Sequence, residues 1–191
     1  MAKAKTTDIP AAGALPEILE LTPYERHLRA EAVQLRFSNG NERTFYRVLP
    51  SGRGAVVIVA LHNDTHVVLT REYACGLHAY TLGLPRGRID EGESVLEAAN
   101  RELREEAGFA ARELTWLRKL SLAPNYMAHE IDVVLARDLY YAPLEGDEPE
   151  PIETILWPLS DIESLALRED FHEGRALGAL LTARAYMQTL R

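Results

Sequence analysis

The stretch GRIDEGESVLEAANRELREEAGF, from Gly87 to Phe109, predicts a helix that carries an unusual concentration of glutamates. Ser94 and Glu97 have the spacing of a capping box, so we expect Ser94 to be the N-cap. Gly108 fits the left-handed position that follows a helix end, which makes Ala107 the last helical residue. The stretch therefore predicts a single helix whose two ends are both fixed by local sequence.

Glu102, Glu105 and Glu106 lie within two turns of this helix. Like charges three or four residues apart on a helix repel by about 0.2–0.5 kcal/mol per pair. Such a set is most often a solvated acidic surface, but Arg101 can reach Glu105, and Glu97 in the preceding turn, and can hold the carboxylates in place. Rigidly held carboxylate oxygens suit Mg²⁺ or Mn²⁺, so we favour a metal site. The apolar stripe expected to face the core, away from the glutamates, comprises Val95, Leu96, Ala99, Leu103 and Ala107.

The composition is that of an ordinary globular protein, with 191 residues of which 47% are apolar and 26% charged. The length suits one domain with an accessory arm. The formal net charge of -8 argues against an extended nucleic-acid surface, because phosphate contacts need clustered Lys and Arg. A divalent cation can still reverse the local sign for a small phosphorylated ligand. We find no apolar run long enough for a signal peptide or a membrane span, and expect a cytoplasmic protein.

Strand and turn signals flank the helix on both sides. Residues 32–37 and 43–48 surround Asn39-Gly40, a strong hairpin signal. Two strands alone are marginal in water, so this hairpin should pack on the main domain or on a second subunit. The mixed order of elements indicates an α/β fold with hairpins. Further strands are expected at residues 55–61, 66–73, 113–122, 130–139 and 154–159.

Two more helices are expected after the last strand. Ser160-Asp161-Ile162-Glu163 has the form of a capping box and should start a helix. Residues 175–190 have helical apolar spacing. An acidic, proline-bearing loop, Leu144–Glu153, precedes the last strand and is a second candidate for chemistry.

The helix and its approach resemble the signature of the Nudix hydrolases: a glycine, five residues, a glutamate, seven residues, then Arg-Glu-apolar-any-Glu-Glu-any-Gly-apolar. The resemblance implies an α/β/α sandwich around a mixed sheet, and hydrolysis of a nucleoside diphosphate linked to another group. From the resemblance together with the hairpin signal at Asn39-Gly40, we expect an N-terminal arm with a β-hairpin at residues 1–52 and the hydrolase domain at residues 53–191. The signature positions are filled by Gly87, Glu93, Arg101, Glu102, Leu103, Glu105, Glu106, Gly108 and Phe109.

The resemblance also implies a role for each of these side chains. Glu102 and Glu106 are the main ligands of Mg²⁺ or Mn²⁺, and Glu105 assists directly or through water. Arg101 and Glu93 orient the carboxylates. The backbone carbonyl of the residue before the signature glycine, Arg86, is a further expected ligand.

Flanking residues bear on the substrate. Pro124, fifteen residues beyond Phe109, resembles the mark of ADP-ribose diphosphatases. Stretches between Leu35 and Leu159 resemble the bacterial NudE type of hydrolase, which acts on ADP-ribose, NADH and diadenosine oligophosphates. The products implied for ADP-ribose are AMP and ribose 5-phosphate.

The chain departs from the wider ADP-ribose group in three places. Gly83 stands where many members have glutamate, Arg86 replaces a small residue, and Asn125 follows the proline. A basic residue at the position of Arg86 is similar to one that lies near phosphates in diadenosine polyphosphate hydrolases. A hydrolase of that type, and a non-catalytic Nudix-fold sensor of ADP-ribose, are the alternatives.

The general base is expected in the acidic loop, because ADP-ribose diphosphatases use a loop glutamate beyond the metal helix. Alignment with the following strand selects Glu150, with Glu148 and Glu153 as alternates. Such a carboxylate need only lie within one hydrogen bond of the water that it deprotonates.

Other residues are predicted to bind the nucleotide substrate. Arg71 and Arg86 are candidates for phosphate or terminal ribose, because a guanidinium makes bidentate pairs with phosphate. Tyr46 and Tyr126 could stack on adenine or serve only in packing. We expect a homodimer in which the N-terminal hairpin crosses to the partner, with no membrane contact.

Overall fold

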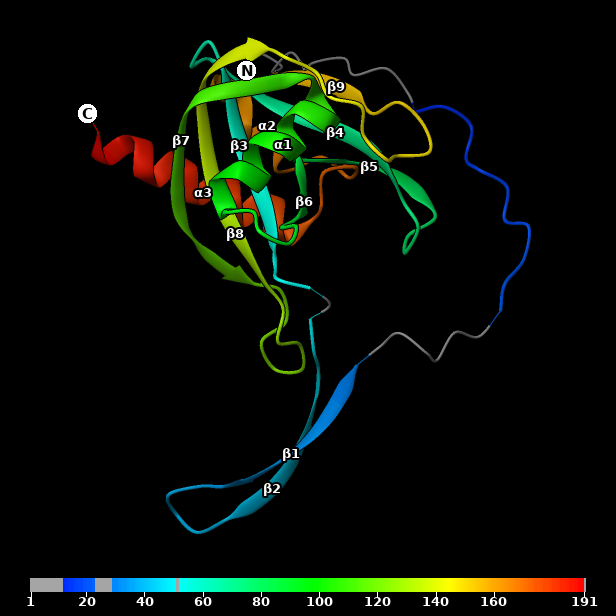
Figure 1. Ribbon diagram of the computed structural model, residues 1–191, viewed down its shortest axis with the longest axis vertical. Coiled ribbons are helices and arrows are strands. Elements are labelled where there is room, and N and C mark those ends of the chain that lie inside the picture. The colour runs from blue at the N-terminus through cyan, green and yellow to red at the C-terminus, as the bar shows by residue number, and fades with distance from the viewer. Residues whose placement is uncertain (1–11, 23–28, 51, 191) are drawn as a thin grey trace, which may run out of the picture.

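Helices cover both faces of a mixed β-sheet in the computed structural model, which describes residues 12–22, 29–50 and 52–190 (Figure 1). Residues 1–11, 23–28 and 51 of the predicted arm lie outside the described residues. The strands are β1 (Ala30–Arg36), β2 (Glu42–Val48), β3 (Ala55–His62), β4 (His66–Ala74), β5 (Ala79–Gly83), β6 (Arg86–Arg88), β7 (Phe109–Ser121), β8 (Glu130–Tyr141) and β9 (Glu153–Pro158). The helices are α1 (Val95–Ala107), α2 (Ile162–Leu165), which follows a 3-10 turn at Leu159–Asp161, and α3 (Gly174–Thr189).

The main sheet has the order β5-β4-β3-β8-β7, with β6 also pairing β3 and β9 also pairing β4. β3 and β8 run parallel, and the other pairs are antiparallel. In the central strand Val56 lies opposite Asp132 of β8 and opposite Gly87 of β6. The segment before α1 is therefore fixed to the middle of the sheet.

The core has two layers, one on each face of the sheet. Strand β3 is apolar along its whole length because both of its faces are covered. One layer, under α2 and α3, includes Trp157 and Phe171. The other layer lies under α1 and is rich in small side chains. Its alanines are Ala60, Ala98, Ala99, Ala107, Ala111 and Ala136. The α/β/α sandwich and mixed sheet predicted from the sequence are confirmed, and α1 lies close to the sheet.

Residues with positive φ occupy the turns of two hairpins. Asn63 and Asp64, between β3 and β4, have φ values of 51° and 53°, which match the two left-handed positions of a type I′ hairpin turn. Gly40, between β1 and β2, has a φ of 80°. The β1–β2 hairpin was predicted from Asn39-Gly40 and is confirmed.

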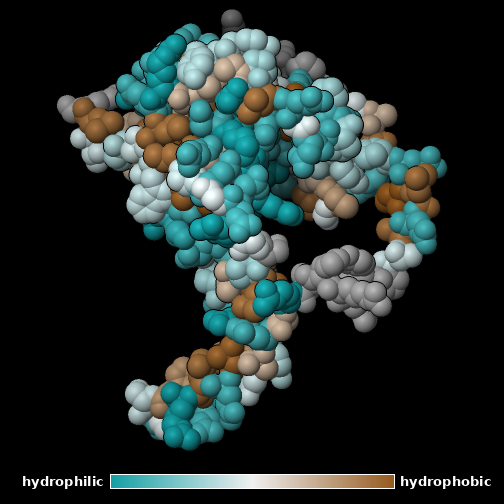
Figure 2. Space-filling model, in the orientation of Figure 1, coloured by the Kyte–Doolittle hydropathy of each residue, from teal (hydrophilic) through white to brown (hydrophobic). Residues whose placement is uncertain are grey.

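The β1–β2 hairpin extends away from the sheet (Figure 1). Two backbone hydrogen bonds of Val48 help to join it to the domain. The N–H of Val48 donates to the carbonyl of Tyr126 at 2.8 Å, and the carbonyl of Val48 accepts from the N–H of Ala128 at 2.9 Å. The register places Val33 opposite Phe45, so these two residues share one face of the ribbon with Leu35. Figure 2 shows hydrophobic side chains along this arm.

Two predictions about the helices were wrong. Leu96 is 36% exposed and does not belong to the buried stripe, which includes Ala98 instead. Ser160 does not cap a helix, because it lies in the 3-10 turn and α2 begins at Ile162 without a side-chain cap.

Within the described residues, no helix is both long and apolar enough to cross a membrane.

Candidate active site

Helix α1 has the ends predicted from its sequence. The Ser94 side chain accepts a hydrogen bond from the N–H of Glu97 at 3.3 Å, and the Glu97 carboxylate accepts one from the N–H of Ser94 at 2.9 Å. Gly108 has a φ of 74°, and its N–H donates to the carbonyl of Arg104. Because the carboxylate of Glu97 closes the capping box, its predicted contact with Arg101 does not form. The caps fix the direction in which the glutamates project.

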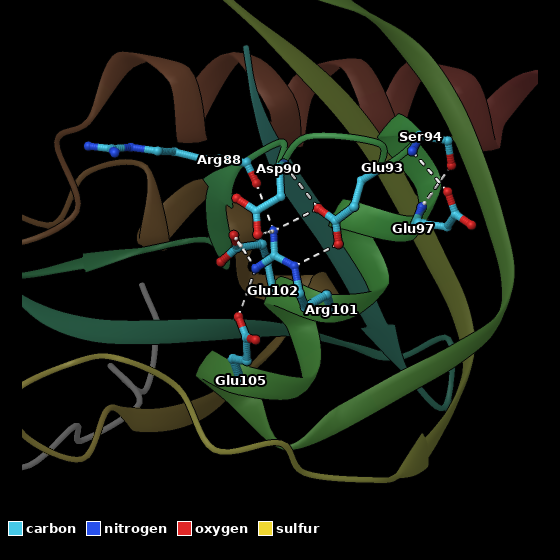
Figure 3. A network of polar contacts seen from close by, with 8 residues as sticks. All are labelled: Arg88, Asp90, Glu93, Ser94, Glu97, Arg101, Glu102 and Glu105. Carbon is cyan, nitrogen blue, oxygen red and sulfur yellow. Dashed lines mark hydrogen bonds and ion pairs between the residues drawn. The ribbon is translucent and has the colours of Figure 1, made fainter. Parts of the chain in front are cut away.

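Arg101 is the hub of the acidic cluster (Figure 3). Its Nε donates to Glu93 at 2.8 Å, and its Nη1 donates to Glu102 at 2.8 Å and to Glu105 at 2.9 Å. Its Nη2 donates to the backbone carbonyl of Arg88 at 2.9 Å. The Arg101 guanidinium lowers the pKa of Glu93 below its usual value. The predicted orienting roles of Arg101 and Glu93 thus have the required contacts.

Glu102 and Glu106 are buried, although they were expected on the side of α1 that faces away from the core. They are only 9% and 8% exposed, because the face of α1 that bears them lies beside β6. The Glu102 carboxylate lies against Gly87, where a Cβ would come within 2.0 Å of the carboxyl carbon. Burial raises the pKa of Glu102, although Arg101 opposes this shift.

Glu106 is the most strongly perturbed carboxyl group of the cluster. It accepts a hydrogen bond from the N–H of Arg86 at 2.9 Å. Burial, and then the negative charge of Glu72, raise its pKa to about 9. Without a cation the folded chain therefore favours a protonated Glu106, and a bound cation would favour the ionised form.

These carboxylates line a cleft of about 690 Å³ between α1, β6 and the acidic loop. Within the described residues no three acidic, histidine or cysteine side chains are already grouped as a metal site, and Arg101 forms ion pairs with Glu102 and Glu105. The donor set still fits a hard divalent cation, because it offers three carboxylates on one rigid helix. Figure 2 shows hydrophilic side chains gathered over this face.

Glu72 was not selected from the sequence. Its carboxylate accepts a hydrogen bond from Arg86 Nη2 at 3.2 Å and one from the Thr70 hydroxyl at 2.9 Å. A signal was present, because Thr70 and Glu72 are polar residues two apart that follow the apolar run at residues 67–69, so they share one face of the strand. The pairing of β4 with β5 was needed to place that face against the cleft.

Arg71 is neither in solvent nor free. Its side chain is 6% exposed, and its Nη1 donates to Glu153 of β9 at 2.8 Å. Both side chains line a second cavity of about 310 Å³, together with Tyr73 and Tyr80. This cavity adjoins the acidic loop, so Arg71 remains a candidate to bind substrate, whereas Glu153 is already paired.

The acidic loop presents Glu148 and Glu150 differently. Glu150 accepts a hydrogen bond from the Tyr80 hydroxyl at 2.6 Å, a contact that sequence reasoning missed. Glu148 lines the cleft of the acidic cluster, and burial, followed by the charges of Glu72 and Asp147, raises its pKa. Glu148 lines both of the cavities described above, whereas Glu150 lines only the second. Both glutamates also line a third cavity, of about 320 Å³, together with Glu102, Glu105 and Glu106.

Tyr46 and Tyr126 are not brought to the acidic cluster within one chain. Tyr46 lies on β2 and is 72% exposed, and Tyr126 lies between β7 and β8 and is 58% exposed. Neither lines the two cavities described above. Their predicted role in stacking stays a prediction.

Comparison with known proteins agrees with this geometry. Residues 52–177 match the NUDIX domain, and residues 16–47 match the NudE-type Nudix hydrolase N-terminal domain. The chain is 47% identical to the ADP compounds hydrolase NudE of Escherichia coli (strain K12), over 91% of this chain and 94% of that protein. It is 25% identical to an ADP-ribose pyrophosphatase of Bacillus subtilis (strain 168), over 73% of this chain and 77% of that protein.

A solved structure of an ADP compounds hydrolase is similar over 90% of this chain and 92% of its own, with a TM-score of 0.79 and 47% identity. The likeness therefore covers the N-terminal segment as well as the sandwich and its acidic helix. The chain belongs to the Nudix family, and it is a Nudix hydrolase.

Proposed function

We propose that this enzyme hydrolyses the diphosphate linkage of ADP-linked compounds such as ADP-ribose, NADH and diadenosine oligophosphates. The products are AMP and the other phosphorylated half. The observation that carries the proposal is the buried pair Glu102 and Glu106, held beside Gly87 in a polar cleft. The similarity to an ADP compounds hydrolase and to an ADP-ribose pyrophosphatase supports the choice of substrate.

Mg²⁺ or Mn²⁺ is the proposed cofactor, with Glu102, Glu105, Glu106 and the carbonyl of Arg86 to hold it. Bound there, the cation supplies Lewis-acid activation of the phosphate and lowers the pKa of water. Arg101 keeps Glu102 and Glu105 in one orientation through two hydrogen bonds. A fixed orientation lowers the cost of gathering like charges around the cation.

The acidic loop supplies the proposed general base. Glu150 was selected by alignment, and it lines a cavity of about 320 Å³ together with Glu102, Glu105 and Glu106. Its carboxylate accepts a hydrogen bond from the Tyr80 hydroxyl. Glu148 already lines the cleft, and burial and the neighbouring negative charges raise its pKa, which makes its carboxylate a better proton acceptor. Replacing Glu148, Glu150 and Glu153 singly by Gln separates them: the base is the residue whose loss lowers kcat most and removes the acidic limb of its pH profile.

The proposed function is tested by comparing turnover of ADP-ribose, NADH and diadenosine triphosphate with Mg²⁺, with Mn²⁺ and with a chelator. AMP should appear with the first two substrates, and the chelator should abolish it. A preference for diadenosine triphosphate alone would make the enzyme a diadenosine polyphosphate hydrolase. Binding of ADP-ribose without any product would make it a sensor.

The arm, residues 1–52, is proposed to join two copies of the chain in a homodimer. Val33, Leu35 and Phe45 give the β1–β2 ribbon an apolar face, and Leu35 and Phe45 are 42% and 46% exposed. A two-stranded ribbon is marginal in water unless such a face is covered. Tyr46 lies on the opposite face of the ribbon. In a dimer it could stack on a nucleotide in the partner's cleft.

A further inference from the structure

We propose that Gly83 and Glu72 are positioning residues that hold the Arg86 guanidinium at the edge of the acidic cleft, ready to bind a phosphate of the substrate. Through Arg86, they favour substrates with a longer phosphate chain. The inference rests on the proposed function, because it assumes that a phosphorylated substrate enters this cleft.

The register of two strands places the three residues together. Gly83 of β5 lies directly opposite Thr70 of β4, and Glu72 is two residues further along β4. Residues two apart on a strand point to the same face, and a directly opposite residue shares that face. A side chain at position 83 would therefore point to the same face as Thr70 and Glu72.

The Arg86 side chain fills the space left by Gly83. An ideal Cβ at Gly83 would lie 2.7 Å from Arg86 Nη1, which is closer than real Cβ contacts allow. On the other side of the guanidinium, Nη2 donates to Glu72 at 3.2 Å. The two departures noted in the sequence, a glycine at 83 and an arginine at 86, thus form one arrangement: the first makes room for the second.

Arg86 has N–H donors to spare, whereas Arg101 does not. All three nitrogens of the Arg101 guanidinium donate to protein oxygens. The side chain of Arg86 is 27% exposed, and its one described side-chain hydrogen bond goes to Glu72. A guanidinium has five donors in a planar fork that matches two phosphate oxygens. Arg88, the third arginine of the cleft, has a side chain that extends away from the cluster (Figure 3).

The Arg86 guanidinium is surrounded by negative charge, so a specific partner is needed to fix its orientation. Glu106 and Glu148 both have pKa values on which Arg86 acts, so its charge lies close to both. Without its bond to Glu72, the guanidinium could turn to either of them. A cation fixed at the rim instead remains available to a phosphate, and each additional phosphate brings more negative charge to be matched.

The test is a double-mutant cycle on the full-length enzyme. Gly83→Ala places its new Cβ against the end of a flexible side chain, so the fold should persist while the guanidinium moves. We expect KM for diadenosine triphosphate to rise about tenfold, with kcat changed less than about threefold and a smaller rise in KM for ADP-ribose. In an Arg86→Gln background, Gly83→Ala should change KM by less than about twofold, because its target is gone.

Gly76→Ala, on the same β4–β5 hairpin, is the matched control, because nothing lies within 4 Å of the new Cβ. It should leave KM, kcat and the melting temperature unchanged. Glu72→Gln should raise KM more when Arg86 is present than when it is absent, because its charge also acts on Glu106. Equal effects of Gly83→Ala with and without Arg86 would overturn the proposal.

A binding measurement separates this inference from the proposed function. Calorimetry with Mg²⁺ and α,β-methylene ADP, which cannot be hydrolysed at that bridge, should show weaker binding to Gly83→Ala than to Gly76→Ala. If the wild-type enzyme hydrolyses no ADP compound, the proposed function fails. If it does so and the two alanine variants bind the analogue equally, only the role of Gly83 and Glu72 fails.

Discussion

The Glu102 carboxylate lies in the space that a side chain at Gly87 would need. An ideal Cβ on Gly87 would lie 2.0 Å from the carboxyl carbon of Glu102 and 2.1 Å from each of its oxygens. The glycine of the signature is therefore required by the close approach of a strand and a helix, and not by its own backbone conformation. Strand β6 and helix α1 form the acidic cleft at this contact.

Gly87→Ala should displace the Glu102 carboxylate and lower kcat/KM by about 10–100-fold, the range seen when a metal ligand loses its orientation. The clashing atoms are the end of a side chain, so circular dichroism should be unchanged. Gly174→Ala, where nothing lies within 4 Å of the new Cβ, is the control and should keep full activity. Full activity of Gly87→Ala would show that this contact is not needed.

Glu106→Gln should lower kcat by more than about a hundredfold, because the amide cannot supply the negative charge that a divalent cation requires. Turnover of ADP-ribose at saturating Mg²⁺ measures this loss. Glu91→Gln changes an exposed glutamate of the same segment and should have no effect. Turnover of Glu106→Gln equal to that of wild type would refute the metal assignment.

The stability of the metal-free enzyme should fall as pH rises from about 5 to about 9. The pKa of Glu106 is raised to about 9, so the unfolded chain loses this proton at a lower pH than the folded chain. One such group lowers the free energy of unfolding by at most about 1.4 kcal/mol per pH unit.

Glu106→Gln isolates this effect, since the amide does not titrate. Thermal melts of the two metal-free proteins should diverge with rising pH, with the variant the more stable at pH 8. Mg²⁺ should raise the melting temperature of wild type and reduce the divergence, because it binds the ionised carboxylate of the folded state. Parallel melting curves across this range would contradict the raised pKa.

Replacing Leu35 and Phe45 together by Ser should convert the proposed dimer to a monomer. Both side chains lie on the exposed apolar face of the ribbon, so their loss removes the surface that a second copy would cover. Sedimentation velocity gives the mass directly. Gln34 and Thr44 lie on the other face, so Gln34→Ser with Thr44→Ser is the matched control, and wild-type protein that sediments as a monomer would refute the dimer.

Local sequence was sufficient to predict α1 and its ends. The caps at Ser94 and Gly108 act within a few residues, and both formed as expected. The same reasoning failed at Ser160, because the chain leaving β9 continues into a 3-10 turn and Trp157 Nε1 donates to the carbonyl of Asp161. A capping pattern predicts a helix start only where tertiary contacts leave the backbone free to follow it.

The surroundings of the glutamates depended on strand pairing and could not be predicted locally. Glu72 reaches Arg86 from fourteen residues away, and Tyr80 reaches Glu150 from seventy residues away. The burial of Glu106 likewise depends on how α1 lies against β6, which the helix sequence alone does not encode. The signature predicted which side chains gather in the cleft, while strand pairing determined their burial and their hydrogen-bond partners.

The alanines beneath α1 determine how close the helix and its glutamates lie to the sheet. Ala98 and Ala99 are fully buried in a layer that also contains Ala60 and Ala136, so small side chains lie between the helix and the sheet. A larger side chain at Ala99 would lift the helix and widen the gap between Glu102 and β6. Larger core side chains are commonly introduced to stabilise proteins. Here they would displace the glutamates of the acidic cleft without contacting them.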